Sequence, residues 1–273
     1  VAHSISPLMH NESFRLLGLD YVYLCFDVNE ETLPAAVAGL KTCGIRGFNL
    51  TMPNKNKIVE LLDELSPEAQ LIGAVNTVLN DNGKLIGYNT DGYGFMQSVR
   101  DAGHDITGKN ITVMGVGGAS MAICAQSALD GAASVHIFAR RTSRYWNRTQ
   151  KFAENLSAKT GCQVCLFDND DHTALRDSIA QSYLLINATS VGMVPDIDDT
   201  IIKDTSLFHP ELVVADVVYE PQETRLLREA KAAGCQTFNG MYMLLHQGAK
   251  AFQIWTGQEM PVSVIKEKYF SVK

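Results

Sequence analysis

The sequence has no long apolar run, no basic leader and no surplus of positive charge. No uninterrupted apolar stretch approaches the ~18 residues that a membrane-spanning helix requires, and residues 1–4 form neither the basic segment nor the apolar core of a signal peptide. The 23 Lys and Arg residues are outnumbered by 30 Asp and Glu residues, which gives a formal net charge of −7, whereas nucleic-acid-binding domains usually carry a basic face. These absences predict a cytoplasmic protein without a membrane or nucleic-acid partner.

The spacing that identifies a metal site is also missing. The seven histidines include no H-E-x-x-H pattern, and among the six cysteines only Cys162 and Cys165 are close in sequence. A redox or zinc pair is expected at a helix N-terminus or beside a second pair, but these two lie in a segment that reads as a strand. We therefore expect no metal, and six free thiols in a reducing compartment.

The 273 residues are enough for two modest domains, and the apolar pattern changes within the chain. Ser6-Pro7 is expected to begin a helix with Ser6 as its N-cap, and residues 21–28 read as a strand. Asn80-Asp-Asn-Gly83 between two strand-like runs predicts a hairpin. After the polar segment 103–109, short apolar strands alternate with helices, which predicts a parallel sheet covered on both faces.

A glycine-rich turn follows the first of these later strands. Gly115-Val-Gly117-Gly118-Ala119-Ser120 lies between a strand and a helix, the context of a dinucleotide site, although Ser120 stands where a third glycine is usual. The helix N-terminus would offer free N–H groups to a pyrophosphate. A tight turn that binds nothing is the alternative.

The type of nucleotide is suggested by the charges after the next strand. An NAD site usually has an Asp or Glu there for the ribose 2′-hydroxyl. Residues 131–153 contain no acidic residue but contain Arg140, Arg141, Arg144 and Arg148. Guanidinium groups can bind a 2′-phosphate through paired hydrogen bonds, so this segment favours NADP over NAD. A solvated basic helix start is the alternative.

Four polar clusters are expected where strands end, at strand–loop junctions in the first half of the chain: His3-Ser4-Ile-Ser6-Pro7, Asn49-Leu-Thr51-Met-Pro-Asn-Lys55, Gly73-Ala-Val-Asn76-Thr77 and Asn89-Thr-Asp91-Gly92. Each alone is typical of a turn or cap. Together, at the strand ends where α/β folds bind ligands, they suit a polyhydroxylated acid.

With these motifs the chain resembles the shikimate dehydrogenase family over essentially its whole length. Further matches are Asn187-Ala-Thr-Ser-Val-Gly-Met193, Asp216-Val-Val-Tyr219 and Gly240-Met-Tyr-Met-Leu-Leu-His-Gln247. The resemblance implies catalysis by Lys55 and Asp91. It implies substrate binding by Ser4, Ser6, Thr51, Asn76, Asp91, Tyr219 and Gln247. The implied cofactor-binding residues, with those of the turn and the basic segment, are Gly115, Gly117, Gly118, Ala119, Ser120, Arg140, Arg141, Arg144, Thr189, Met193, Val217 and Gly240.

The resemblance further implies an α/β fold of two domains and an activity. An N-terminal α/β substrate domain, residues 1–102, would be completed by helices in residues 239–273. A Rossmann-type, doubly wound NADP-binding domain would cover residues 103–238. The reaction would be the reversible, NADP-dependent reduction of 3-dehydroshikimate to shikimate, by a monomer or homodimer.

Two departures from the family pattern leave alternatives open. Family members usually carry a strand before His3-Ser4, and its absence would leave an exposed sheet position. Ala139 replaces the usual asparagine before Arg140, so NAD remains possible. One alternative is therefore a quinate/shikimate dehydrogenase using NAD or NADP. A nucleotide-sensing regulator without catalysis is a second, which the presence of Lys55 and Asp91 disfavours.

Overall fold

The computed structural model describes residues 4–270, which form two compact units. The first contains the described residues up to Gly94 and those from Leu244 onward, and the second contains Phe95–Met243. The chain passes between the units within two helices, α5 (Asp91–Asp101) and α10 (Met241–Thr256). The first unit is therefore built from two separate parts of the sequence. The predicted domain limits at residues 102/103 and 238/239 stay a prediction.

The remaining elements follow in chain order. The helices are α1 (Ser6–Leu16), α2 (Leu33–Thr42), α3 (Asn54–Lys57), η1 (Ile58–Leu61), α4 (Pro67–Ile72), α6 (Gly118–Leu129), α7 (Trp146–Thr160), α8 (His172–Gln181), η2 (Thr205–Leu207), α9 (Arg225–Ala232) and α11 (Val262–Tyr269). The strands are β1 (Gly47–Asn49), β2 (Glu64–Leu65), β3 (Thr77–Asp81), β4 (Lys84–Tyr88), β5 (Asn110–Met114), β6 (Ser134–Ala139), β7 (Gln163–Asp168), β8 (Leu184–Asn187), β9 (Val213–Asp216) and β10 (Gln236–Asn239).

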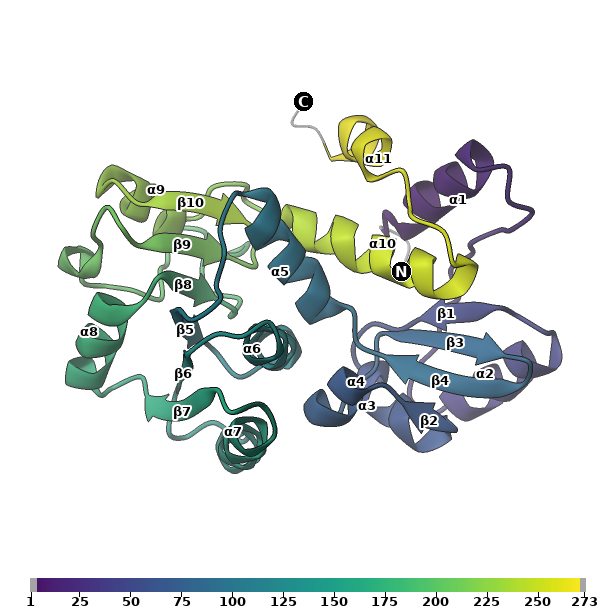
Figure 1. Cartoon of the computed structure of the whole chain (residues 1–273), viewed down its shortest axis with the longest axis horizontal. Coiled ribbons are helices and arrows are strands. Elements are labelled where there is room, and N and C mark those ends of the chain that lie inside the picture. The colour runs from purple at the N-terminus through teal and green to yellow at the C-terminus, as the bar shows by residue number, and fades with distance from the viewer. Residues whose placement is uncertain (1–3, 271–273) are drawn as a thin grey trace. The chain divides into compact units, whose positions relative to one another are not determined.

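The second unit is a doubly wound parallel sheet. Its strand order is β10-β9-β8-β5-β6-β7 and all its pairs are parallel. Helices α6 and α7 cover one face and α8 and α9 the other (Figure 1). Under α8 and α9 lies an apolar core that includes Phe138, Leu185, Val214 and Leu226. The order reverses between β5 and β8, and the crevice beyond the strand ends at such a point is where these folds bind ligands. The expected α/β fold with a Rossmann-type unit is confirmed.

The first unit contains a smaller mixed sheet in the order β1-β3-β4-β2. Strands β3 and β4 form the expected hairpin. Its turn residues Asn82 and Gly83 have φ angles of 53° and 92°, the left-handed conformation that a two-residue Asn-Gly turn requires. The core beneath includes Val37, Ile58 and Val78. The sheet places the ends of β1 and β4 so that the polar clusters that follow them can meet.

Two expectations about the N-terminal segment were wrong. Residues 21–28 form no strand, because nothing in the described chain pairs with them along their length. The backbone of Tyr23 bonds instead to the Asn11 side chain, and Val22 and Leu24 are 70% and 59% exposed. Ser6 is the first residue of α1, whereas the N-cap is Ile5, which makes no side-chain cap bond. The Ser6 hydroxyl is therefore not used as a cap.

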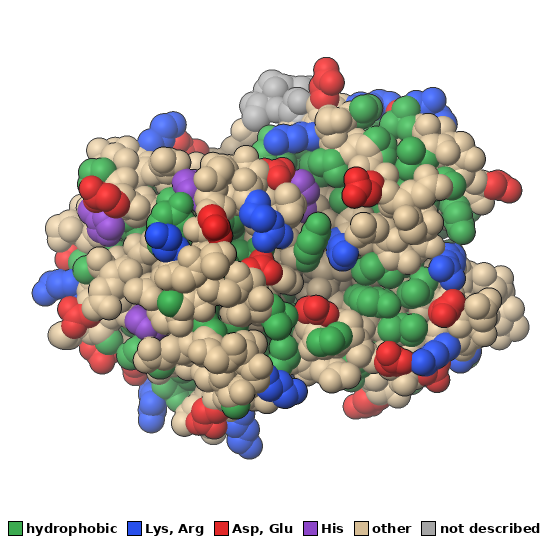
Figure 2. Space-filling model, viewed as in Figure 1, with side chains coloured by type: hydrophobic (Ala, Val, Ile, Leu, Met, Phe, Trp, Pro, Cys, Tyr) green, Lys and Arg blue, Asp and Glu red, His purple; other side chains and the backbone are tan. Residues whose placement is uncertain are grey.

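Acidic and basic side chains are interspersed over the face drawn in Figure 2, so neither sign forms a continuous field there. Among the described residues, every helix is too short or too polar to cross a bilayer.

Candidate functional site

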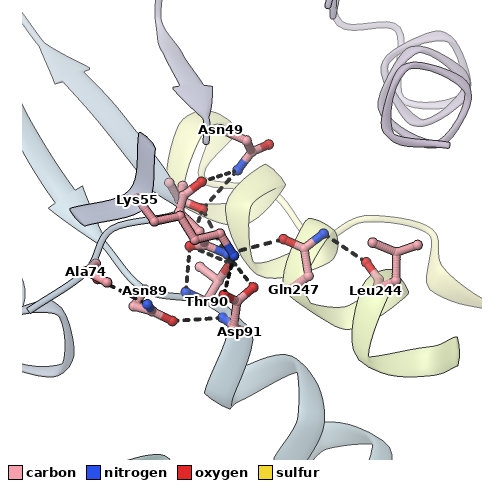
Figure 3. Close-up of polar contacts among 10 residues, drawn as sticks. Asn49, Lys55, Ala74, Asn89, Thr90, Asp91, Leu244 and Gln247 are labelled. Atoms are coloured by element: carbon pink, nitrogen blue, oxygen red, sulfur yellow. Dashed lines mark hydrogen bonds and ion pairs between the residues drawn. The ribbon is translucent and has the colours of Figure 1, made fainter. Parts of the chain in front are cut away.

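Three of the polar clusters of the first unit, those containing Lys55, Asn76 and Asp91, meet at an ion pair between Lys55 and Asp91. Lys55 lies on the short helix α3 and Asp91 begins α5. Lys55 Nζ is 2.6 Å from Asp91 Oδ2, and the two side chains are only 19% and 12% exposed (Figure 3). Partial burial strengthens the attraction relative to a solvated pair. The pair is thus a cation held in a defined direction but still reachable by a small molecule.

Asn76, which follows α4 and precedes β3, holds the second oxygen of this carboxylate. Asn76 Nδ2 donates to Asp91 Oδ1 at 2.9 Å, and Asn76 Oδ1 accepts from the Thr90 backbone N–H at 2.8 Å. The same Nδ2 lies 3.4 Å from Gln247 Oε1 on α10 (Figure 3). Asn76 is only 2% exposed. Both oxygens of Asp91 are therefore engaged, which restricts rotation of the carboxylate that orients Lys55.

Asn49 and Tyr23 extend this network, and sequence reasoning assigned them no role. Asn49 Nδ2 donates to Asn76 O and to Thr77 Oγ1, both at 3.0 Å. The Tyr23 hydroxyl donates to Asn49 Oδ1 at 3.0 Å. Burial raises the pKa of Tyr23 to about 12, so this phenol remains a donor near neutrality. The position of Asn49 at the end of a strand was the signal that could have identified it.

The other expected substrate residues are placed as follows. Ser6 is half-buried beside Tyr23, and Ser4 is exposed, with its hydroxyl accepting a bond from Ser6 N at 3.2 Å. Thr51 is exposed after β1, and Gln247 is half-buried. Tyr219 belongs to the second unit, after β9, and is 41% exposed. His3 of the first motif lies outside the described residues.

In the second unit the glycine-rich turn lies at the point where the strand order reverses. Gly115 has φ 109°, and a Cβ there would come within 2.8 Å of Thr189 Cγ2, so the turn packs against the loop after β8. Gly117 caps α6 without a side-chain bond, and a Cβ at Gly117 or Gly118 would meet open space. Ser120 is buried and its hydroxyl donates to Gly115 O. The helix N-terminus is thus open to an anion, while Ser120 tightens the turn from inside.

The basic segment follows β6, the strand beside β5. Arg140 is exposed immediately after the strand. The Arg141 guanidinium lies 4.7 Å from the centre of the Trp146 ring, and that of Arg144 lies 4.7 Å from the centre of the Tyr145 ring. Stacking of this kind restricts a guanidinium and leaves its edge available for hydrogen bonds. Arg140 and Arg141 are consecutive at the strand end, where an adenosine ribose would lie.

Loops after β8, β9 and β10 carry the remaining expected cofactor residues. Thr189 and the exposed Met193 follow β8, and Val217 follows β9. A Cβ at Gly240 would come within 2.2 Å of Val217 O, so only glycine fits there. Within the described residues, no group of three or more His, Cys, Asp or Glu side chains is arranged to hold a metal ion.

Comparison with known proteins gives consistent matches. Two family models match the chain: the shikimate dehydrogenase substrate binding domain over residues 1–78, and the shikimate 5'-dehydrogenase C-terminal domain over residues 240–268. The shikimate dehydrogenase (NADP(+)) of Listeria innocua is 52% identical over 270 residues, which cover 99% of this chain and 92% of that protein.

Solved structures match along the same length. Shikimate 5-dehydrogenase from Listeria monocytogenes, in complex with shikimate and NAD, is 51% identical with a TM-score of 0.95, over 98% of this chain and 92% of that chain. Quinate dehydrogenase from Corynebacterium glutamicum, in complex with NAD, is 31% identical with a TM-score of 0.86, over 99% of this chain and 95% of that chain.

Proposed function

This chain belongs to the shikimate dehydrogenase family, and we propose that it catalyses the reversible, NADP-dependent reduction of 3-dehydroshikimate to shikimate. The observation that carries the proposal is the Lys55–Asp91 pair, a cation oriented by a carboxylate that is itself locked by Asn76. A ketone reduction needs such a cation where negative charge develops on the oxygen.

The roles of the chain's own residues follow from that charge. A nicotinamide cofactor, when bound, would supply the hydride for the ring carbonyl carbon and would accept it in the reverse direction. Lys55 donates a hydrogen bond to the carbonyl oxygen and gives it a proton as negative charge develops. Asp91 keeps the Lys55 ammonium aligned and accepts a hydrogen bond from a substrate hydroxyl. Asn76 prevents the Asp91 carboxylate from turning away.

Substrate binding is assigned to hydroxyl and amide side chains. Ser4 and Ser6 offer two hydroxyl donors to the substrate carboxylate, and the Ser6 hydroxyl is not needed as a helix cap. Thr51, Asn76 and Gln247 of the first unit would hold the ring hydroxyls. Tyr219 of the second unit is a further proposed substrate-binding residue. Bound shikimate and 3-dehydroshikimate are the small-molecule partners of this proposal.

Features of the second unit support NADP as the cofactor of the proposed nucleotide site. The open N-terminus of α6 and the space at Gly117 and Gly118 suit a pyrophosphate. Arg140, with Arg141 and Arg144, would bind the 2′-phosphate, in a segment without a carboxylate to repel it. Thr189, Met193, Val217 and Gly240 would line the nicotinamide side.

A quinate/shikimate dehydrogenase that also uses NAD is the second candidate. It is supported by the likeness to the Corynebacterium glutamicum quinate dehydrogenase and by Ala139, which replaces the family's usual asparagine. A regulator that only senses nucleotide has no comparable support, because it would not need the Lys55–Asp91 pair.

The deciding experiment measures steady-state rates with shikimate and with quinate, each against NADP and NAD. We expect shikimate with NADP to give the highest kcat/KM. A higher kcat/KM for quinate with NAD would establish the second candidate. No turnover of any of the four pairs by folded protein would overturn both.

We place the enzyme in the cytoplasm as a monomer or homodimer. All six cysteines are free thiols, and Cys25 and Cys43 are exposed, which fits a reducing compartment. Fractionation of the source cells and sedimentation of the purified protein would test the two statements.

A further inference from the structure

A buried carboxylate in the second unit has no role in the proposed chemistry. Asp216 is the last residue of β9 and is fully buried. Its Oδ1 accepts from Asn187 Nδ2 at 3.0 Å and from Val218 N at 2.9 Å, and its Oδ2 accepts from Thr224 Oγ1 at 2.7 Å. Burial raises the pKa of Asp216, although these donors lower it. Because a buried carboxylate needs its hydrogen bonds, and Asp216 is bonded through both oxygens, it fixes the positions of the residues that donate to it.

The bonds of Asp216 join two loops at the carboxyl edge of the sheet. Asn187, at the end of β8, bonds through Oδ1 to Thr189 N and Oγ1 and through Nδ2 to Val191 O. The loop after β9 is held by Val218 N, and its far end by Thr224, the N-cap of α9. The loop after β8 and the loop after β9 therefore share one buried anchor.

Strand order shows which half of a dinucleotide these loops face. Arg140 follows β6 and the glycine-rich turn follows β5, while the two anchored loops follow β8 and β9 on the other side. A cofactor with its 2′-phosphate at Arg140 and its pyrophosphate at Gly115–Gly118 must extend its nicotinamide half over β8 and β9. Thr189 and Val217, both expected to contact the cofactor, lie on the anchored loops.

We propose that Asp216 is a positioning residue that holds the loops after β8 and β9 in the shape that binds the nicotinamide half of the cofactor. The inference rests on the proposed function, because it takes the occupant of this edge to be NADP. It makes Asp216 act through Asn187, Val218 and Thr224, without touching the reacting atoms. An error of about 1 Å in placing the hydride donor can lower a rate by about 10²-fold, so such positioning is kinetically visible.

The test compares the whole cofactor with its adenosine half in the Asp216→Asn enzyme. The probe for that half is 2′,5′-ADP, which carries the 2′-phosphate but no nicotinamide. We expect the Kd and KM of NADPH to rise and kcat to fall, each by about 10-fold or more, while the Kd of 2′,5′-ADP changes by less than about 2-fold. If Asp216→Asn weakens the binding of NADPH and of 2′,5′-ADP equally, Asp216 supports the fold in general and the inference is overturned. Unchanged kinetics with NADPH would also overturn it.

Further variants keep the test decisive if Asp216→Asn does not fold. Thr224→Val removes one hydrogen-bond donor to Asp216 and should also weaken NADPH binding without changing the Kd of 2′,5′-ADP, to a smaller extent. Thr224→Ser keeps the hydroxyl and should retain the wild-type kinetics with NADPH. Ser178→Ala is the control: it removes a buried bond to His136 in the same unit and should lower stability without this selective weakening of NADPH binding. If the wild-type enzyme binds NADPH but does not reduce 3-dehydroshikimate, only the proposed function is contradicted. The inference about Asp216 can still be tested, because the Kd values of NADPH and 2′,5′-ADP remain measurable in the wild type and in the variant.

Discussion

At the scale of single residues, the Lys55–Asp91 pair differs from the ion pairs on the surface of this molecule. Lys84 and Glu64, for example, are each more than half exposed, and such pairs contribute little. Lys55 and Asp91 are mostly buried, and Asp91 is also bonded by Asn76. Burying two charges costs desolvation free energy unless the ion pair is well aligned and its remaining hydrogen bonds are made. Functional sites often keep such unfavourable local interactions.

Lys55→Ala should therefore remove most of the catalytic rate. The expected fall in kcat is about 10²–10⁴-fold, the usual contribution of an acid–base group, with a small change in KM. Lys57→Ala is the matched control, because Lys57 lies on the same short helix, is 47% exposed and pairs only with Glu60 among the bonds described. A Lys55→Ala enzyme with more than about half of the wild-type kcat would remove Lys55 from the catalytic role.

Ser6→Ala should separate ligand binding from helix capping. The Ser6 side chain is not a cap of α1, so its loss should leave the helix intact. We expect KM for shikimate to rise far more than KM for NADP, measured with each substrate varied in turn. Ser13→Ala, which removes a buried hydroxyl bonded to Met9 O on the same helix, is the control for packing effects. Equal changes in both KM values would indicate a structural role for Ser6.

At the scale of elements, the sequence predicted what local chemistry determines. The Asn82-Gly83 turn and the glycine-rich turn were both confirmed, because left-handed φ angles at Gly83 and Gly115 need glycine whatever the surroundings. The strand expected at residues 21–28 was wrong, since a strand exists only with a hydrogen-bonded neighbour, and its composition says nothing about whether one is present.

The residues of the candidate site also differ in whether the sequence alone could identify them. Lys55, Asp91 and the arginines of the basic segment were named from sequence, as predictions that still await a direct test. The parts played by Asn49 and Asp216 were not, because their partners lie on distant segments: Asn49 bonds to Asn76, which precedes β3, and Asp216 bonds to Asn187 at the end of β8. A supporting bond between distant segments leaves no local pattern in the sequence.

We expect cofactor choice to depend on one element, the connection between β6 and α7. Residues 131–153 contain no carboxylate, and each charge-assisted bond to a phosphate contributes roughly 1.5–3 kcal/mol, or about 10–150-fold in affinity. We expect kcat/KM for NADP to exceed that for NAD by at least about tenfold. Arg140→Ala should reduce this ratio, because it should weaken the binding of NADP and leave the binding of NAD little changed.

The control for Arg140 is Arg228→Ala, which removes the same charge from an exposed position on α9 of the same unit. It should leave the NADP/NAD ratio as in the wild type. A preference for NAD in the wild type, or unaltered NADP affinity after Arg140→Ala, would contradict the assignment of the basic segment.

At the scale of the whole molecule, a buried histidine in the first unit contacts aromatic rings from both parts of the sequence that form this unit. His10 on α1 is fully buried, and its ring stacks on Tyr23 at 4.6 Å and lies 5.2 Å from the ring of Trp255 on α10. Neither ring nitrogen has a hydrogen-bond partner among the described residues. Burial without a partner disfavours the charged form and lowers the pKa of His10 to about 3.

This burial should make the folded protein sensitive to mild acid. Between pH 6.5, the ordinary value, and about 3, the unfolded chain protonates His10 but the folded chain does not, so stability falls as the pH falls through this window. From pH 7 to pH 5 the loss is at most ~2 kcal/mol, at ~1.4 kcal/mol per pH unit. His10→Phe keeps a stacked ring but cannot titrate, so its free energy of unfolding, measured by urea denaturation, should fall less over this range than that of the wild type.

The control is His172→Gln, at an exposed position on α8, which should keep the wild-type dependence of the free energy of unfolding on pH. Equal slopes for the wild type and His10→Phe would mean that His10 does not govern the acid sensitivity.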